Sequence, residues 1–302
     1  MKSGDRSTEI PPAVLHGFAR FVQSLSHRRA LKFGESVGSF LKLILRSKAR
    51  ITRDNLVLAF PELDNTPELA FLEKRIFRHF GRVGVEFLRF PLMDSEWLRR
   101  NVSVEGMEHV FERLQAGKGV LVLSAHFGNW EFAMKRLAID LPKQIHVVIR
   151  RIKDPNVHEF IRGYREKFGG GVSIIQDNGA LPILRVLKKN GIVVTVLDQN
   201  AGTVEGVFSP FFGRPAATYS SVARIAYHLD IPLLPVFDVA LEDGKHRIII
   251  GPPLTTSRHS EQEFIQSLTD RCNETIERMI RLYPEQWIWM HNRWKTKKPD
   301  IS

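Results

Sequence analysis

The sequence lacks the features that mark several common protein classes. It contains one cysteine, Cys272, so it cannot form an internal disulfide, and a lone thiol favours a reducing compartment. The first twelve residues, MKSGDRSTEIPP, have no apolar signal-peptide core. No window approaches the roughly 18 apolar residues that a membrane-spanning helix needs. No nucleotide motif and no Cys/His cluster with zinc spacing is present, so we expect neither a cofactor nor a metal.

The chain does have length, apolar residues and positive charge. Its 302 residues are 43% hydrophobic, which is enough to bury a sizeable core. The net charge is +11, and residues 1–60 hold eleven Lys or Arg against four Asp or Glu. A nucleic-acid partner is not expected, because no recognition motif accompanies this charge.

The basic segment 1–60 also carries apolar residues at helical spacing. They are Phe18, Phe21, Val22, Leu25, Val37, Phe40, Leu41, Ile44 and Leu45. Such a helix pair either lies on an anionic membrane surface or packs on the core with a solvated basic face. Lys42, Arg46 and Arg50 recur every four residues, which favours the membrane interpretation.

The remainder of the chain indicates an α/β fold. The stretch PELDNTP, residues 61–67, ends the helical N-terminal part, and a helix follows at about Glu68–Phe90. From Gly119 onward, strand-like and helix-like runs alternate. The predicted strands are Val120–Ser124, Ile145–Ile149, Val172–Ile175, Ile192–Leu197, Pro232–Val239 and Arg247–Ile250, and the predicted helices are Trp130–Ala138, Pro155–Phe168, Gly179–Lys189, Thr218–His228 and Glu261–Leu282. We therefore expect a largely parallel sheet flanked by helices, preceded by a basic helical N-terminal segment. The expected organisation is one domain, 1–302, with the basic segment at 1–60 and the α/β core at 61–302.

One stretch, VLVLSAHFGNWEFA at residues 120–133, suggests a site. His126 ends a predicted strand, and reactive residues collect at the carboxyl ends of parallel strands. On one helix His126 and Glu131 would point about 140° apart. A turn through Gly128–Asn129 followed by a helix would instead fold Glu131 back toward His126. Asn129 is a plausible N-cap, and the free N–H groups of the turn suit a developing negative charge.

These residue types fit general base catalysis. A histidine that accepts the proton of an attacking alcohol contributes about 10²–10⁴-fold to a rate. A carboxylate on the other ring nitrogen fixes the tautomer, and this role falls to Glu131. The alternative is a strand-end histidine capped by a carboxylate for stability alone, and the chemistry by itself leaves both interpretations open.

Five segments, in order from about residue 50 to 297, resemble one family. SAHFGNWE is similar to the H-x4-D/E box of the glycerolipid and lysophospholipid acyltransferases, and more closely to that of the lipid A late acyltransferases, the lauroyl and myristoyl transferases of Gram-negative bacteria. The other segments that resemble that family are RDNLVLAFPEL (53–63), VIRRIKDPN (148–156), LDQNAGTVEGVFSPFFGRPAAT (197–218) and PEQWIWMHNRWKTK (284–297).

The resemblance implies transfer of an acyl chain from acyl carrier protein to a hydroxyl of a lipid A precursor, on the cytoplasmic face of the inner membrane. His126 and Glu131 carry over as the dyad. Arg150 matches a family arginine that would hold phosphate or the oxyanion, with a surface cation as the alternative. Asp198 is either a polar support of the site or a turn cap. The candidate substrate-binding residues are Arg150, Asn129, Asp198 and Arg214, the last for an acidic headgroup.

The sequence departs from the family at two points. Asn200 stands where the family often has a second acidic residue, and the usual N-terminal hydrophobic anchor is missing or reduced. We therefore expect a peripheral or weakly anchored protein. Relatives with the same box acylate other lipids, so a lysophospholipid or another glycolipid is the alternative acceptor. A non-catalytic lipid-binding protein at the membrane surface is a further alternative.

Three other features have competing interpretations. GESVG at residues 34–38 matches a hydrolase nucleophile elbow, but basic, broken sequence precedes it, so Ser36 is expected on a helix face. Packing in the core is favoured over lipid contact for the aromatic residues Phe208, Phe211, Phe212, Trp287, Trp289 and Trp294. Cys272 lies in a helical run with no nearby histidine motif, which favours direct transfer over an acyl-enzyme.

Overall fold

The structure is a computed structural model that describes residues 9–175, 179–202 and 206–298. The first eight residues of the basic segment and residues 203–205 of the segment 197–218 lie outside the described residues.

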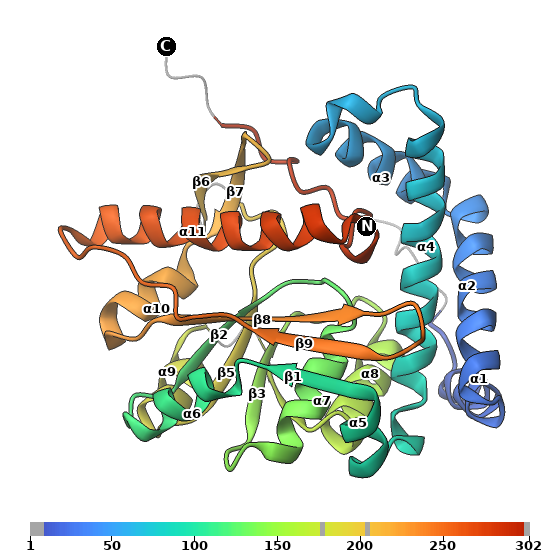
Figure 1. The fold of residues 1–302 in the computed structure, drawn as a ribbon, viewed down its shortest axis with the longest axis horizontal. Helices are drawn as coiled ribbons and strands as arrows, with labels where there is room; N and C mark the ends of the chain where they lie inside the picture. The colour runs from blue at the N-terminus through green and yellow to red at the C-terminus, as the bar shows by residue number, and fades with distance from the viewer. Residues whose placement is uncertain (1–8, 176–178, 203–205, 299–302) are drawn as a thin grey trace, which may run out of the picture.

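A seven-stranded sheet with the order β1-β9-β8-β2-β5-β3-β4 forms the centre of the molecule (Figure 1). Its strands are β1 (Val102–Glu105), β2 (Val120–Ser124), β3 (Ile145–Ile149), β4 (Gly171–Ile175), β5 (Ile192–Val196), β8 (Leu233–Ala240) and β9 (His246–Ile250). Every neighbouring pair is parallel except β8 and β9. The predicted α/β class with a largely parallel sheet is therefore confirmed.

Helices surround this sheet. They are α1 (Pro12–Ser24), α2 (His27–Ile44), α3 (Arg46–Ala59), α4 (Pro67–Leu88), α5 (Ser95–Asn101), α6 (Met107–Gln115), α7 (Trp130–Asp140), α8 (Pro155–Phe168), α9 (Leu181–Lys188), α10 (Ser221–Leu229) and α11 (Glu261–Leu282). Figure 1 shows α10 and α11 on one side of the sheet, α5, α6 and α7 on the other, and α2 and α4 upright at one end.

The alternation of side chains along β2 explains the two layers. Leu121 and Leu123 point into the larger core, which they share with α10 and α11. Val120 and Val122 point into a second core with α7 and the end of α4. Because both faces of β2 are covered, its sequence is a continuous apolar run.

The hairpin of β6 (Gly206–Phe211) and β7 (Arg214–Tyr219) was not predicted. Its turn places both Phe212 and Gly213 at positive φ, 51° and 69°, as a tight two-residue hairpin turn requires. Thr218 belongs to β7, so the helix predicted from Thr218 begins only at Ser221.

The basic segment packs closely on the rest of the molecule where its helix α2 meets α4. A Cβ atom added to Gly38 would lie 2.0 Å from the carbonyl oxygen of Phe77, and one added to Gly34 would lie 2.5 Å from that of Gly81. Only glycine permits this approach of two helix backbones. The outer side of the segment leaves large apolar side chains exposed: Val14, Phe18, Phe21, Phe40, Leu43, Ile44 and Leu45. None of the described helices is both long and apolar enough to cross a bilayer.

Candidate active site

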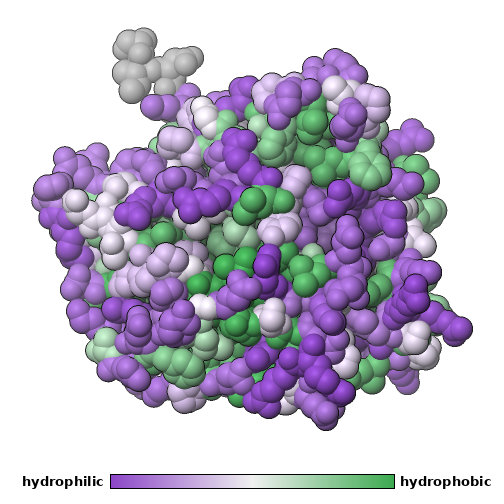
Figure 2. Space-filling model, in the orientation of Figure 1, coloured by the Kyte–Doolittle hydropathy of each residue, from purple (hydrophilic) through white to green (hydrophobic). Residues whose placement is uncertain are grey.

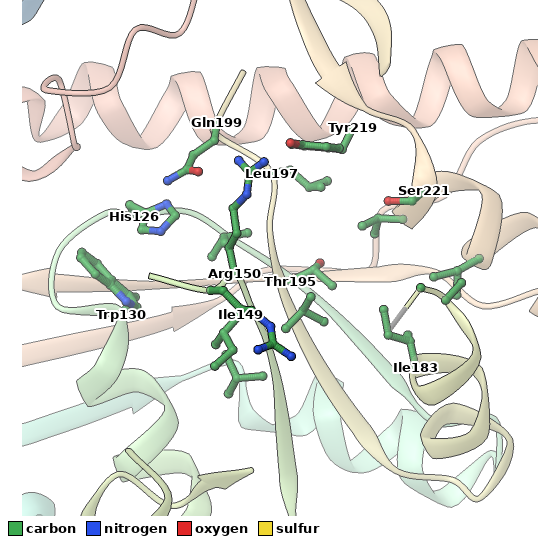
Figure 3. A pocket seen from close by; sticks show the side chains of 18 of the residues that line it. His126, Trp130, Ile149, Arg150, Ile183, Thr195, Leu197, Gln199, Tyr219 and Ser221 are labelled. Carbon is green, nitrogen blue, oxygen red and sulfur yellow. The ribbon is translucent and has the colours of Figure 1, made fainter. Parts of the chain in front are cut away.

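A cavity of about 790 Å³ opens at the carboxyl ends of β2, β3 and β5. Figure 3 shows His126 and Trp130 on one side of it, Ile183 and Ser221 on the opposite side, and Arg150 between them. Strands far apart in the sequence thus bring their following residues to one place, as expected for an open parallel sheet.

His126 lies at the end of β2 and is held by Asp198, which follows β5. The Nδ1 atom of His126 lies 2.9 Å from Oδ1 of Asp198, and the backbone N–H of His126 donates to Oδ2 at 2.9 Å. The indole Nε1–H of Trp287 also donates to Oδ2, at 2.9 Å. Asp198 is buried, whereas the imidazole of His126 is partly exposed to the cavity. The remaining ring nitrogen, Nε2, has no hydrogen-bond partner among the described residues, and the ring to which it belongs lines the cavity.

The pair also sets the pKa values of both groups. Burial alone would lower the pKa of His126, but the negative charge and hydrogen bond of Asp198 outweigh it and raise that pKa. Burial alone would raise the pKa of Asp198, but His126 and the donated hydrogen bonds lower it. Asp198 therefore remains ionised at neutral pH, and the imidazolium form of His126 is stabilised.

Glu131 has a different partner from the one expected. Its two carboxylate oxygens accept from Nε of Arg165, at 2.9 Å, and from Nη2 of the same guanidinium. The indole Nε1–H of Trp130 donates to Oε1 at 3.2 Å. The prediction that Glu131 is the carboxylate on the second nitrogen of His126 is wrong, because Asp198 occupies that place. The turn does bring Glu131 to the cavity wall, where its charge still acts on His126.

The cavity has a cationic part and an apolar part. Arg150 follows β3, is exposed, and has no ion pair or hydrogen bond among the described residues. Arg162 and Arg224 also line the cavity, and each lies near a glutamate. The apolar wall includes Val147, Val148, Ile183, Leu197, Val222 and Ile225.

Three of the four predicted substrate-binding residues do not line the cavity. Asp198 is buried behind His126 and supports it, which confirms the predicted polar support of the site and not a substrate contact. Asn129 is fully buried and accepts from the backbone N–H of Phe132, so its predicted N-cap role on α7 is confirmed. Burial leaves it no contact with a substrate. Arg214 is exposed at the turn of the β6–β7 hairpin, and its Nε donates to the carbonyl oxygen of Leu58. The structure therefore does not bring Arg214 to the cavity.

The competing interpretations are resolved by packing. Ser36 lies within α2 and donates to the carbonyl oxygen of Lys32, so no strand precedes it and it forms no nucleophile elbow. Core packing is confirmed for Phe211, Phe212, Trp287, Trp289 and Trp294, which are all buried and in ring contact with one another.

Two residues of the site were not identified from the sequence. Arg165 lies in α8, outside every segment that resembles the family. In the sequence it is only a basic residue about one turn before the end of a helix. Trp287 lies in the closing segment, where core packing was expected for it but not the hydrogen bond to Asp198. Close by, Nε2 of His291 accepts from the backbone N–H of Asn200 at 3.0 Å, and burial lowers the pKa of His291 to about 4. Within the part of the chain that the structure describes, no cluster of three His, Cys, Asp or Glu side chains is arranged to hold a metal ion.

Comparison with known proteins gives one consistent family. A family model described as bacterial lipid A biosynthesis acyltransferase matches residues 12–296. The chain is 24% identical over 291 residues to the lipid A biosynthesis lauroyltransferase of Escherichia coli (strain K12), covering 94% of this chain and 91% of the relative. It is 25% identical over 266 residues to the palmitoleoyltransferase of the same organism, covering 87% and 84%. A phosphatidylinositol mannoside acyltransferase of Mycobacterium tuberculosis (strain CDC 1551 / Oshkosh) is 26% identical over 220 residues, covering 71% and 67%.

Proposed function

The chain belongs to the bacterial lipid A biosynthesis acyltransferase family, and we propose that it moves a fatty acyl chain from acyl carrier protein to a hydroxyl of a lipid A precursor. One observation carries the proposed chemistry: His126 is bound through Nδ1 to the buried carboxylate of Asp198, which leaves Nε2 for the acceptor hydroxyl. The names of the relatives support the acyl group and the lipid acceptor.

The proposed reaction is a direct transfer with His126 as general base. Nε2 takes the proton of the acceptor hydroxyl while its oxygen attacks the thioester carbonyl carbon. The tetrahedral intermediate collapses, the carbon–sulfur bond breaks, and the imidazolium returns its proton to the leaving thiolate. Asp198 keeps the proton of the resting ring on Nδ1 and stabilises the imidazolium.

In this proposal Glu131 does not take part in the proton transfer itself. It lies on the cavity wall and keeps the side chains around His126 in place. Its bidentate pair with Arg165 fixes both side chains, and Trp130 is held against His126 at a ring-centroid distance of 5.1 Å. Arg150, whose guanidinium is not paired, is the proposed partner of a substrate phosphate or of the oxyanion.

The acyl chain is proposed to occupy the apolar part of the cavity. Leu197, Ile183 and Ile225 of this wall line the same cavity as His126. Burial of each methylene there contributes about 0.8 kcal/mol, so the depth of the wall would select the chain length.

The proposed location is peripheral, on the cytoplasmic face of the inner membrane, and the exposed apolar face of the basic segment supports the membrane contact. Phe18 and Phe21 of α1 are 44% and 48% exposed, and Leu43 of α2 is 70% exposed. Figure 2 shows apolar side chains gathered at the end of the molecule over α3 and the start of α4, among hydrophilic ones. Lysines and arginines beside such a face would pair with anionic lipid headgroups.

A second acceptor class has one observation in its favour. The identity to a phosphatidylinositol mannoside acyltransferase, 26%, is close to the 24% found for the lauroyltransferase, although it extends over 220 residues and not 291. The same dyad chemistry on another membrane lipid is therefore the alternative, and a lipid-binding protein without catalysis is the third possibility to test.

Acyl transfer to defined acceptors separates these functions. Acyl carrier protein loaded with a panel of chains is supplied with either a tetra-acylated lipid A precursor carrying its inner sugars or a lysophospholipid, and mass spectrometry reads the added acyl group. We expect transfer to the lipid A precursor by the wild type and by Ser36→Ala, and none by His126→Gln. Transfer to the lysophospholipid alone would make a lysophospholipid the acceptor in place of the lipid A precursor. If a phosphatidylinositol mannoside is supplied as a third acceptor, no transfer to any of the three would refute the proposed acyltransferase activity.

A further inference from the structure

A second group of buried ionisable side chains lies behind the turn that joins His126 to Glu131. His246, the first residue of β9, is 1% exposed. Its Nδ1 lies 2.8 Å from Oδ2 of Asp238 on β8, and its Nε2 lies 3.2 Å from Oε1 of Glu86 on α4. Both ring nitrogens face carboxylate oxygens, which is the geometry of an imidazolium that donates two hydrogen bonds. We call His246, Asp238 and Glu86 the anchor triad.

Both carboxylates of the anchor triad also hold Asn129. The backbone N–H of Asn129 donates to Oδ2 of Asp238 at 2.8 Å, and its side-chain Nδ2 donates to Oε2 of Glu86 at 2.9 Å. The Oδ1 atom of Asn129 caps α7. The triad thus fixes the one residue that both ends the turn after His126 and begins the helix that carries Glu131.

The backbone at Gly128, next to Asn129, is also tightly constrained. Gly128 has φ of 57°, and a Cβ atom at this position would lie 1.9 Å from the carbonyl oxygen of Asp238. The N–H of Gly128 donates to the carbonyl of Gln286 at 2.9 Å, and His79 lies 3.3 Å from the carbonyl of Gly128 through Nε2. The turn therefore packs directly against the anchor triad.

The charges of the anchor triad depend on one another. Burial opposes the charged form of His246, but Asp238 and Glu86 overcome it and raise its pKa to about 10. Burial likewise opposes ionisation of Glu86, but His246 lowers the pKa of Glu86 to about 2. At Asp238 burial outweighs the opposing effect of His246 and raises the pKa, so this carboxylate depends most on its cation to stay ionised. The other ionisable groups that act on the triad are His79, Arg82 and His27. Buried ionic groups seldom stabilise a fold more than apolar ones, and their best-attested use is to specify one arrangement.

We infer that His246 is a positioning residue for acyl transfer: by holding Asp238 and Glu86 it fixes the turn 127–129, and with it the placement of His126 relative to α7. This inference rests on the proposed function of His126. His246 does not line the cavity and touches no substrate, so it acts only through the triad and Asn129.

Two variants separate positioning from packing. His246→Gln leaves two buried carboxylates side by side without a cation, so the turn shifts and kcat falls about 10- to 100-fold, as for a misplaced catalytic group, while KM is unchanged. The double variant His246→Gln/Glu86→Gln restores the net charge of the triad and can keep every hydrogen bond to Asn129. It recovers most of the lost kcat. His146→Gln, at a half-buried histidine of β3, is the matched control and keeps full activity.

Hydrogen exchange supplies a readout that does not depend on activity. Amide exchange of the peptide spanning residues 127–132 is measured in each folded variant by mass spectrometry. We expect faster exchange in His246→Gln and a return toward the wild-type rate in the double variant. An unchanged kcat and exchange rate in His246→Gln, or a double variant no better than the single one, would overturn the inference. If the wild type transfers no acyl group, the proposed function fails, and the exchange rates alone decide whether the triad anchors the turn.

Discussion

Asp198→Asn is the perturbation that probes the proposed base most sharply. In the wild type, Oδ2 of Asp198 accepts from the backbone of His126 and from Trp287, and Oδ1 accepts from Nδ1 of His126. An asparagine satisfies the first two donors only with its oxygen, which turns its NH₂ group toward Nδ1. The imidazole must then accept through Nδ1 and carry its proton on Nε2.

That tautomer has no lone pair for the acceptor hydroxyl. The variant should therefore lose most of the contribution of general base catalysis, about 10²–10⁴-fold in kcat or roughly 3–5 kcal/mol. Because every hydrogen bond around position 198 keeps a donor and an acceptor, the fold should survive. Asp140→Asn, at a partly exposed aspartate paired with Arg136, is the control and should keep full activity.

The pH profile gives the same variant a second readout. His126 must be neutral to act as a base, so activity rises with pH as the ring loses its proton. Asp198 raises the pKa of His126 and places this rise above pH 6.5 in the wild type. Without the carboxylate, the midpoint should move to lower pH while the plateau falls. Initial rates from pH 5 to 9 test both effects, and a folded variant with an unchanged plateau and midpoint would refute the reasoning.

Three further outcomes follow from other parts of the site. Glu131→Gln leaves a buried arginine without its counter-ion and should cost roughly 3–5 kcal/mol in urea unfolding, whereas Glu159→Gln at an exposed pair should cost almost nothing; equal costs would contradict the buried pair. Ile225→Trp narrows the apolar part of the cavity, so in competition between C10 and C16 acyl donors the ratio of C10 to C16 product should rise. An unchanged ratio would place the acyl chain elsewhere. Phe18→Ser/Phe21→Ser removes two half-exposed rings, and burying one such ring completely contributes up to about 1.5–3 kcal/mol. The amount of protein that floats with phosphatidylglycerol-rich vesicles should therefore fall at least tenfold. Unchanged binding would exclude α1 from the membrane contact.

The sheet was predictable where burial leaves a strong pattern. β2 and β5 are continuous apolar runs with turn residues around them, because both of their faces are covered. β1, with the sequence VSVE, buries only Val102 fully, and so its pattern was too weak to identify. The β6–β7 hairpin was missed because its turn consists of Phe212 and Gly213, and a bulky residue at positive φ is not a usual turn signal.

The site was predictable only as far as local spacing determines it. His126 follows from its place at the end of a strand, and Asn129 follows as the N-cap of the next helix. The partner of His126 does not follow, because Asp198 lies 72 residues further along and reaches the ring only through the pairing of β2 with β5. Glu131 was assigned to the ring because the turn folds it back, but its carboxylate pairs with Arg165 of α8, a contact that no local pattern encodes.

The central claim is that Asp198 holds His126 with its proton on Nδ1 and its lone pair on Nε2. Nitrogen NMR of the protein with ¹⁵N-labelled histidine reports this tautomer directly, at a pH above the pKa of the ring. We expect the Nδ1–H tautomer in the wild type, a titration midpoint above 6.5, and the same midpoint in the pH profile of kcat/KM. A neutral ring protonated on Nε2, or a midpoint that differs from the kinetic one, would contradict the account.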